Sequence, residues 1–557
     1  MSLFKEIGNK PGLLALLTAG LLWLGWPVHP APLALLLLVA WVPYLRLEQV
    51  LTRRGASGWK VFRYTYLALV LWNLFTTYWV SYSTLGGGIA AVVLNALLMC
   101  IPTMAFYHTK RLAGPLLGYL SLPVYWIAFE QLHLHWDLTW PWLTLGNGFA
   151  QATSLIQWYE YTGFLGGSLW IWVVNILVFR TLCGLSANDA LTAAPTQSAK
   201  LRWLAPVLAV ALPILLSYGI GAAYQEKGAE AEVLVVQPNV DPFKEKFPST
   251  INFIPYDQQL TRMLTLTEQN LTPQTRLVLW PETALEESNW EATFESLPKT
   301  QRLRQFLGAH PGVELITGIT SLGSYPSQET ASPTARYRDD LGYYDVFNTA
   351  AYLPSGTGGT QFYHKSRLVP GVEKVPVSLA KLVNNIDLGG TVGSYGSQEQ
   401  RTVFRMAGAD SALRVAPVIC YESVYADFVG EYVRNGATLI GIITNDGWWS
   451  DSPGYRQHLQ YATLRAIETR RDIARSANTG ISGFINQKGE IVQRTEWWKM
   501  AVSRATVHLN TELTFYVRFG ELIGRGAQLA AVLLLLFVVV QAFSQPAVRT
   551  ENVEPIA

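Results

Sequence analysis

Charged residues are scarce in this sequence. Asp, Glu, Lys and Arg together make up 15% of the 557 residues, whereas soluble domains carry about 25%. This composition disfavours a wholly soluble protein. The 42 basic and 40 acidic residues leave a formal net charge of +2, so no general attraction to nucleic acid is expected.

Cysteine is nearly absent as well. The three cysteines, Cys100, Cys183 and Cys420, are too few for a disulfide framework and lack the close spacing of zinc ligands. Cys100 and Cys183 lie inside or beside apolar runs, where a cysteine usually acts as a small buried hydrophobe. If a cysteine carries chemistry here, it acts singly.

Hydrophobic residues make up 50% of the chain and are concentrated in runs. Seven of these precede a long polar region, near 12–27, 31–45, 64–82, 86–107, 115–132, 163–179 and 203–222, and one follows it, Leu522 to Phe543. Most approach the roughly 20 residues that cross a bilayer as a helix. We expect about eight transmembrane helices, the first of them retained, because no small-residue cleavage site follows it.

Basic residues are distributed unequally between alternate loops. One set of loops holds twelve: Lys5, Lys10, Arg46, Arg53, Arg54, Lys60, Arg63, Lys110, Arg111, Arg180, Lys200 and Arg202. The other set, near 28–31, 83–86 and 133–162, holds none. The bias predicts a cytoplasmic N-terminus. We therefore expect a membrane domain over 1–225, an extracytoplasmic domain over 226–519, and a last helix with a short cytoplasmic tail over 520–557.

The loop near 133–162 is rich in aromatic residues: Trp136, Trp140, Trp142, Trp158 and Tyr159. Such residues settle at the headgroup level of a bilayer. They form either an aromatic belt or a wall of a lipid-binding cleft.

The polar region alternates short apolar runs with helical patterns. Strands are expected at Glu232–Gln237, Arg276–Trp280, Val313–Ile319, Val346–Leu353, Leu413–Ile419 and Thr438–Ile443, and helices near 256–270, 298–308, 423–434 and 456–472. The alternation predicts an α/β layered domain with one large core. Gly436 is placed to end the third helix, and Gln487 to Glu490 read as a hairpin turn.

Three strand-like segments end in chemically functional residues. The first runs into Glu282, the second carries Lys365 with Glu373 eight positions later, and the third delivers Cys420 to a turn. α/β folds place their chemistry at the carboxyl ends of strands. A base, a cation and a thiol are the parts of an acyl-transfer site.

Each of these residues has a physical task. A thiol with a pKa of about 8.5 is mostly protonated at neutral pH and needs a base to become a nucleophile. Glu282 can accept the proton, and Lys365 can stabilise the thiolate and an oxyanion. Glu373 and Glu422 could hold Lys365 charged and oriented. Taken alone, Cys420 is more simply a buried hydrophobe, and Glu282 and Lys365 ordinary charged residues.

Three ordered motifs match a known superfamily. They are Trp280-Pro281-Glu282-Thr283, then Tyr363-His364-Lys365-Ser366-Arg367-Leu368-Val369-Pro370, then Cys420-Tyr421-Glu422. The order resembles the Glu-Lys-Cys triad of the nitrilase superfamily. With seven spans ahead and one behind, the chain resembles its membrane-embedded members, the apolipoprotein N-acyltransferases. Trp140-Pro141-Trp142-Leu143, Asn445-Asp446-Gly447-Trp448 and Gln457-His458 extend the resemblance over nearly the whole chain.

The resemblance implies an αββα sandwich and a role for each matching residue. Glu282 would be the general base, Lys365 the oxyanion stabiliser and Cys420 the nucleophile. Glu373 would support the lysine, while Tyr421 and Glu422 would shape the site. One departure is visible, because family members commonly read Val-Pro-Phe-Gly-Glu where this chain has Val369-Pro370-Gly371-Val372-Glu373.

The reaction that the resemblance implies is ping-pong acyl transfer. Cys420 takes an acyl chain from a phospholipid as a thioester, and the α-amine of a lipoprotein's diacylglyceryl-cysteine then takes it as an amide. No cofactor or metal is needed, and the setting is the bacterial inner membrane. Trp280, Trp448 and Trp449 are candidates for substrate binding, the last two on a loop that either covers the acyl chain or packs as core.

Two other functions remain open at this stage. A membrane-tethered amidohydrolase would use the same triad, although a tether needs one helix rather than eight. A transporter or scaffold with an inert outer domain is the other, although the expected spans hold few of the charges that mark solute pathways.

Overall fold

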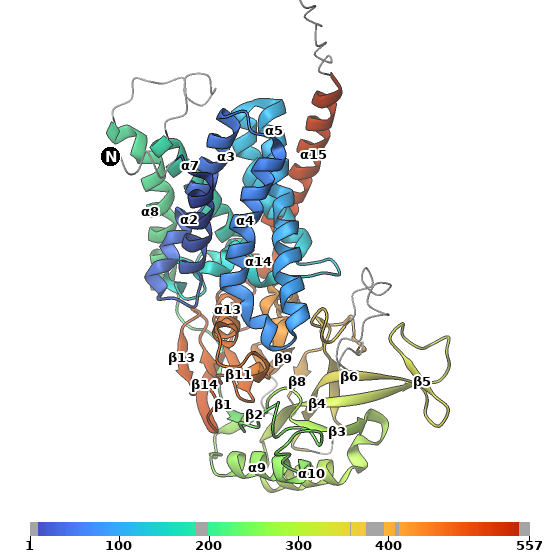
Figure 1. Cartoon of the computed structure of the whole chain (residues 1–557). Coiled ribbons are helices and arrows are strands. Elements are labelled where there is room, and N and C mark those ends of the chain that lie inside the picture. The colour runs from blue at the N-terminus through green and yellow to red at the C-terminus, as the bar shows by residue number, and fades with distance from the viewer. Residues whose placement is uncertain (1–8, 184–198, 357, 375–394, 407–411, 545–557) are drawn as a thin grey trace, which may run out of the picture.

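The computed structural model describes residues 9–183, 199–356, 358–374, 395–406 and 412–544. Figure 1 shows a helical bundle with an α/β domain at one end, and the helix α15 returning along the bundle. The bundle elements are α2 (Pro11–Leu24), η1 (Ala31–Leu38), α3 (Val42–Arg53), α4 (Gly58–Thr77), η2 (Tyr78–Tyr82), α5 (Leu85–His133), α6 (Tyr159–Thr162), α7 (Phe164–Cys183), α8 (Ala199–Ala223) and α15 (Leu522–Ser544).

The bundle identifies a membrane protein. Within the described ranges, five segments are long and apolar enough to cross a bilayer: Ala31–Arg53, Leu85–His133, Phe164–Cys183, Leu201–Ala223 and Leu522–Ser544. The helix Pro11–Leu24 is apolar but shorter. Five segments are fewer than the eight runs of the sequence, and α5 accounts for part of the difference.

α5 is two antiparallel helices joined at Gly114. A straight helix of its 49 residues would be about 74 Å long, more than twice the hydrocarbon thickness of a bilayer. Gly114 breaks the helix with a φ of 86°. The Thr109 hydroxyl then lies 3.0 Å from the Tyr125 hydroxyl, a contact that only a reversed chain can make. The two halves match the separate runs expected near 86–107 and 115–132.

The α/β domain contains two sheets. The first has the order β14-β1-β2-β4-β6-β5, with β3 on β4 and β7 on β6, and the second has the order β13-β12-β11-β10-β9-β8. The first is formed by β1 (Ala229–Gln237), β2 (Thr275–Leu279), β3 (Leu285–Trp290), β4 (Glu314–Tyr325), β5 (Arg336–Arg338), β6 (Gly342–Leu353), β7 (Gln361–His364) and β14 (Ala501–Leu509). The second is formed by β8 (Phe404–Arg405), β9 (Arg414–Ile419), β10 (Leu439–Thr444), β11 (Ile473–Ala477), β12 (Gly483–Ile485) and β13 (Ile491–Arg494).

The two sheets pack face to face, as the expected sandwich requires. Strand residues alternate between faces, so Val233 and Leu279 of the first sheet share a core with Val418 of the second. Leu234 and Val278 point the other way, under α9 (Tyr256–Glu268) and α10 (Pro298–Ala309). The second sheet carries α12 (Ala426–Arg434) and α13 (Pro453–Thr469). The nitrilase-like layered domain is thus confirmed.

Most of the expected elements are present within a few residues of their predicted bounds. The six strands and four helices all form, Gly436 follows α12 with a φ of 97°, and the turn Gln487 to Glu490 joins the antiparallel strands β12 and β13. The strands β3, β5, β8, β11 and β14 have no counterpart among the predicted strands. β14 pairs antiparallel with β1, from Ala229 opposite Leu509 to Gln237 opposite Ala501.

α13 lies between the second sheet and the bundle (Figure 1). Its side chains donate hydrogen bonds to backbone carbonyls of the membrane part: Gln457 Nε2 to Thr76 O at 2.8 Å, Tyr461 to Trp142 O at 2.7 Å and Thr463 to Ala150 O at 2.7 Å. The bundle and the domain are therefore joined through the middle of this helix.

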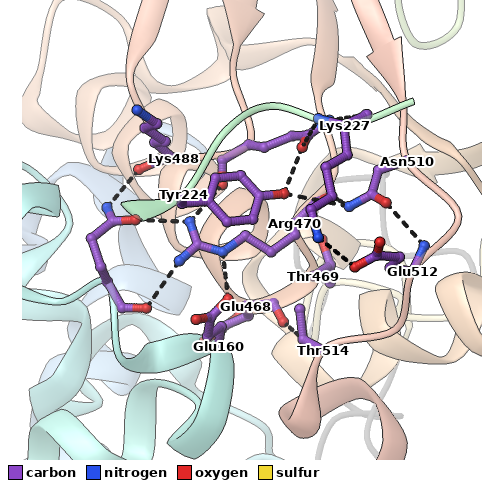
Figure 2. A network of polar contacts seen from close by, with 12 residues as sticks. Glu160, Tyr224, Lys227, Glu468, Thr469, Arg470, Lys488, Asn510, Glu512 and Thr514 are labelled. Atoms are coloured by element: carbon purple, nitrogen blue, oxygen red, sulfur yellow. Dashed lines mark hydrogen bonds and ion pairs between the residues drawn. The ribbon is translucent and has the colours of Figure 1, made fainter. Parts of the chain in front are cut away.

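Arg470, directly after α13, ties several chain segments together, and Figure 2 shows this network. Its guanidinium donates to Glu160 Oε2 at 2.7 Å, to Gln157 Oε1 at 2.8 Å and to Gln487 O at 3.1 Å, and it lies 4.2 Å from the centre of the Tyr224 ring. Asn510 donates to its carbonyl at 2.9 Å. These six residues, Gln157, Glu160, Tyr224, Arg470, Gln487 and Asn510, are called the Arg470 junction below.

Candidate active site

Cys420 stands at the carboxyl end of β9, where the chain turns into the short 3₁₀ segment η8 (Cys420–Val424). Its φ of 49° lies in the left-handed region, which costs a residue other than glycine about 1–2 kcal/mol. The side chain is 8% exposed. The backbone thus holds the thiol in an unfavourable conformation that the surrounding structure must stabilise.

Lys365 lies between two glutamates. Its ammonium donates to Glu282 Oε1 at 3.1 Å and to Glu373 Oε1 at 2.7 Å, and all three side chains are buried. Glu282 follows β2, and Lys365 follows β7. The three residues singled out in the sequence, Glu282, Lys365 and Cys420, are therefore brought together, since both charged groups interact electrostatically with the thiol.

Asn348, a β6 residue that the sequence reasoning missed, completes the carboxylate cluster. Its amide donates to Glu282 Oε1 at 2.8 Å and to Glu373 Oε1 at 3.1 Å. The other oxygen of Glu282 accepts from the Asn445 N–H at 2.9 Å. A polar amide inside the apolar run Val346–Leu353 was the available signal, because such a residue needs a buried partner.

The pKa values of Glu282 and Cys420 are shifted in opposite directions. Burial acts to raise the pKa of Glu282, but Lys365 and the Asn348 amide outweigh it and hold that pKa below its ordinary value. Burial and the Glu282 carboxylate raise the pKa of the Cys420 thiol, against the opposing effect of Lys365. At neutral pH the site therefore rests as a thiol beside an ionised carboxylate.

Glu373 keeps its contact with Lys365 despite the altered loop. Gly371 has a φ of 79°, which glycine adopts without strain. The Val369 N–H donates to Glu373 Oε2 at 2.8 Å. With Gly371-Val372 in this loop, Glu373 still reaches the Lys365 ammonium.

Glu422 is placed differently from the expectation. It makes no hydrogen bond to the Lys365 ammonium. Instead it accepts from the Tyr363 hydroxyl and the Ser366 N–H, each at 2.7 Å, and from the Ile419 N–H at 2.8 Å. Glu422 thus fixes the backbone that carries Lys365 and Cys420, and its effect on the ammonium is electrostatic and indirect.

Tyr421 connects the site to the bundle. Its ring lies 5.9 Å from that of Trp142, and its hydroxyl donates to Thr139 O at 3.3 Å. Trp142, Trp158 and Tyr159 are buried. These three aromatic residues of the 133–162 segment therefore pack as part of the protein interior, rather than as a belt exposed to lipid.

The three tryptophans suggested for substrate binding have different surroundings. Trp280 is fully buried and donates to the Thr267 hydroxyl at 3.0 Å, so its ring is core beneath α9 and cannot touch a substrate. Trp449 packs against Trp79 of the bundle, with ring centres 4.9 Å apart, and Trp448 against Phe243 at 5.3 Å. Only Trp448 and Trp449 remain candidates.

The described residues contain no group of three His, Cys, Asp or Glu side chains able to hold a metal. Cys100 is buried in α5, and Cys183 is half-buried at the end of α7. Both fit the structural role that the sequence indicated.

Comparisons with known proteins identify the family. A model of the apolipoprotein N-acyltransferase N-terminal domain matches residues 18–177, and a carbon-nitrogen hydrolase model matches residues 254–512. The apolipoprotein N-acyltransferase of Chlorobaculum tepidum is 30% identical over 525 residues, covering 92% of this chain and 94% of that protein. The chain belongs to the apolipoprotein N-acyltransferase family. The corresponding protein of Geobacter metallireducens is 26% identical over 541 residues, covering 93% of each chain.

The two family models match the two parts of the structure. The acyltransferase N-terminal match spans the bundle from α2 into α7, and the hydrolase match runs from just before α9 to just beyond β14. Among solved structures, a nitrilase-superfamily protein of Saccharomyces cerevisiae matches 54% of this chain and 99% of its own, with 15% identity and a TM-score of 0.35.

Proposed function

We propose that this protein transfers an acyl chain from a membrane phospholipid, through a thioester on Cys420, to the α-amine of the diacylglyceryl-cysteine that begins a lipoprotein. The observation that carries the proposal is the Glu282–Lys365 ion pair beside a buried thiol, at a sheet edge joined to an apolar bundle. Its family membership and the acyltransferase names of its relatives support this activity.

The first half-reaction forms the thioester. Glu282 accepts the Cys420 proton, the sulfur attacks the ester carbonyl, and the Lys365 ammonium stabilises the oxyanion that forms. The intermediate then collapses, and the lysophospholipid leaves with the proton returned by Glu282.

The second half-reaction uses the same groups in reverse. The amine of the acceptor attacks the thioester, and Glu282 accepts its proton. The carbon–sulfur bond then breaks and releases the amide product, and Glu282 returns the proton to the Cys420 sulfur, which becomes a thiol again. The buried Glu373 and Asn348 position Lys365 and Glu282 through both steps. No metal or other cofactor takes part in either step.

The membrane arrangement is the second part of the proposal. Both substrates are anchored in lipid, so the site must lie at a bilayer surface. We assign eight spans to α2, η1 with α3, α4, the two halves of α5, α7, α8 and α15. The domains are then 1–225, 226–519 and 520–557, with both termini in the cytoplasm of a bacterium and the α/β domain outside its inner membrane.

The distribution of basic residues supports this orientation. The labelled part of α3 lies toward the end of the bundle that is remote from the α/β domain (Figure 1). Arg54, directly after α3, donates to Asn9 O at 2.8 Å, and Lys110 pairs with Glu48 of α3 at 2.7 Å. An impermeant thiol label on a cysteine introduced between Ser324 and Ser332 should react in intact spheroplasts. Labelling that required opened membranes would reverse the topology.

The activity is tested by following the acyl group. The purified protein is incubated with phospholipid and a diacylated lipopeptide, and intact mass and products are measured. Wild type and Cys100→Ser, which alters a buried bundle cysteine, should gain one acyl chain and pass it to the peptide. Cys420→Ser should do neither, because a hydroxyl is a far weaker nucleophile.

Two outcomes would contradict the proposal. Acylation that persists in Cys420→Ser would remove Cys420 from its role. Transfer of the chain only to water, with no lipopeptide product, would indicate a membrane amidohydrolase or lipid hydrolase using the same triad.

A further inference from the structure

A second buried polar cluster lies against the backbone of Cys420. It consists of Ser423, Thr444, Asp446, His458 and Arg475, each at most 1% exposed. The mechanism above does not use these residues. Burying two formal charges and an imidazole together is costly unless each is well paired, so their arrangement calls for a reason.

The imidazole of His458 joins Asp446 to the backbone of Cys420. His458 Nδ1 lies 2.9 Å from Asp446 Oδ1, and its Nε2 lies 3.0 Å from the Cys420 carbonyl oxygen. A neutral imidazole has one N–H, and with that proton on Nε2 the ring donates to the Cys420 carbonyl, with the Ser423 hydroxyl 2.9 Å from the same nitrogen. Nδ1 then accepts from Arg475 Nη2 at 3.1 Å, and it donates to Asp446 Oδ1 only when the ring carries a second proton. The ring therefore bridges a carboxylate and the main chain of the proposed nucleophile.

The bridge is anchored on both sides. Arg475 donates to Asp446 Oδ2 at 2.6 Å, and Thr444 donates to Asp446 Oδ1 at 2.8 Å. The Ser423 hydroxyl donates to the Cys420 carbonyl at 2.8 Å. Asp446 is thus fixed by groups from β10 and β11, and the carbonyl of Cys420 is held by two donors.

The position of these donors is informative because Cys420 has the left-handed φ of 49°. In that conformation the carbonyl of Cys420 is turned away from the β9 ladder, whose last paired residue is Ile419. Two buried donors capture it there. We infer that His458, oriented by Asp446 and Arg475, is a positioning residue that holds Cys420 in its strained conformation and so aims the thiol at Glu282 and Lys365.

This inference rests on the proposed function, since it assumes that Cys420 forms the thioester. A purely structural role for His458 predicts a different pattern. Loss of packing lowers stability without regard to which ring nitrogen is replaced, whereas positioning depends on the donor that faces the carbonyl.

Two substitutions separate the ring nitrogens. The amide of His458→Gln reaches the place of Nε2 and can still donate to the Cys420 carbonyl, whereas the shorter His458→Asn replaces only Nδ1. We expect His458→Asn to slow acyl-enzyme formation about 10-fold or more at saturating phospholipid, because a buried carbonyl loses a donor. The apparent KM should stay within about twofold, and His458→Gln should recover most of the rate.

Two further variants keep the test decisive. His133→Asn alters a buried histidine of the bundle. It should leave the rate of acyl-enzyme formation unchanged, even if it lowers the thermal stability as much as His458→Asn does or more. If His458→Asn does not fold, Asp446→Asn leaves the imidazole in place and should slow acylation in the same direction. The rate of Cys420 alkylation by iodoacetamide should fall in parallel with acylation in each slowed variant.

The outcomes distinguish this inference from the proposed function. Cys420-dependent acylation at the wild-type rate in folded His458→Asn and Asp446→Asn would overturn the positioning role alone. Equal losses in His458→Gln and His458→Asn, tracking thermal stability, would overturn it as well. Acylation that does not depend on Cys420 would overturn the proposed function instead.

Discussion

Asn348 is the residue that orders the two carboxylates around Lys365. Replacing it with leucine, of similar size, removes one donor from Glu282 and one from Glu373. Hydrogen bonds to charged groups contribute about 1.5–3 kcal/mol, so Asn348→Leu should slow acyl-enzyme formation about 10- to 100-fold, measured by intact mass over time.

The control for Asn348 is Asn289→Leu. Asn289 is a buried amide of β3 that donates only to backbone carbonyls, among them Thr320 O at 2.8 Å. This variant should lose stability but keep its rate of acylation. Equal rates in the two variants would mean that Asn348 does not act on the carboxylates.

The pKa of Cys420 gives a second prediction at the same scale. Burial and Glu282 raise that pKa, so at neutral pH less thiolate is present than for a free cysteine. Alkylation by iodoacetamide, measured in a Cys100→Ser, Cys183→Ser background, should keep rising above about pH 9, beyond the ordinary cysteine pKa of about 8.5. Lys365→Met should move the curve to still higher pH. A plateau near pH 7 would contradict this assignment of charges.

The sequence could single out the three residues that we propose to react, but not the residues that support them. Glu282 and Cys420 each follow an apolar strand, and Lys365 follows the short strand β7, so the pattern is local. Asn348 and the hydrogen bonds of Glu422 depend on which strands are neighbours across a sheet, and no local pattern reports this. For the same reason Glu422, two residues from Cys420, was expected on the lysine but lies on the backbone.

Among the elements, the loop after β10 carries the two tryptophans that remain candidates for substrate binding. The loop contains Gly447 and Gly454, and glycine can give a loop the freedom to move. In the structure a side chain on Gly447 would meet Thr479 and Pro242, and one on Gly454 would meet the Trp79 ring. Both glycines therefore permit close packing, which favours a firmly seated loop.

Single substitutions can distinguish the roles of Trp448 and Trp449. Trp449 packs against Trp79, Trp142 and His458, so Trp449→Ala should lower the thermal stability. Trp448 contacts Phe243 and Phe247 and should affect stability less. If Trp448 covers the acyl chain, Trp448→Ala should raise hydrolysis of the acyl-enzyme, measured as loss of the mass adduct in the absence of acceptor. Unchanged hydrolysis would leave Trp448 a packing residue only.

The strand β11 was missed because its polar residues are buried only through hydrogen bonds to other segments. Buried strands such as β9 and β10 are nearly continuous in apolar residues, which made them visible. β11 contains Arg475 and Ser476, which are buried because Asp446 and the Val236 carbonyl pair with them. These partners lie on β1 and just after β10, and the sequence alone shows only a short apolar run interrupted by an arginine and a serine.

For the whole molecule, the Arg470 junction decides how firmly bundle and domain are joined. Removing one partner of a buried ion pair costs about 3–5 kcal/mol. Arg470→Met, which leaves Glu160 and Gln157 without their donor, should lower the midpoint of thermal unfolding. It should also speed proteolysis near the exposed residues 227–230, while Arg302→Met, at an exposed ion pair, should not. Equal protease sensitivity of the two variants would show that the Arg470 junction contributes little.

The pairing of β1 with β14 has a consequence for how the protein is made. β1 leaves the ribosome first among the strands, and its partner follows only after the rest of the domain. At about 5–20 residues per second, the wait lasts some tens of seconds. During that time the Ala229–Gln237 edge is an unsatisfied, largely apolar template for other chains. Newly made protein should therefore depend on chaperones until Leu509 has been synthesised, and truncation just before β14 should yield aggregates rather than a smaller enzyme.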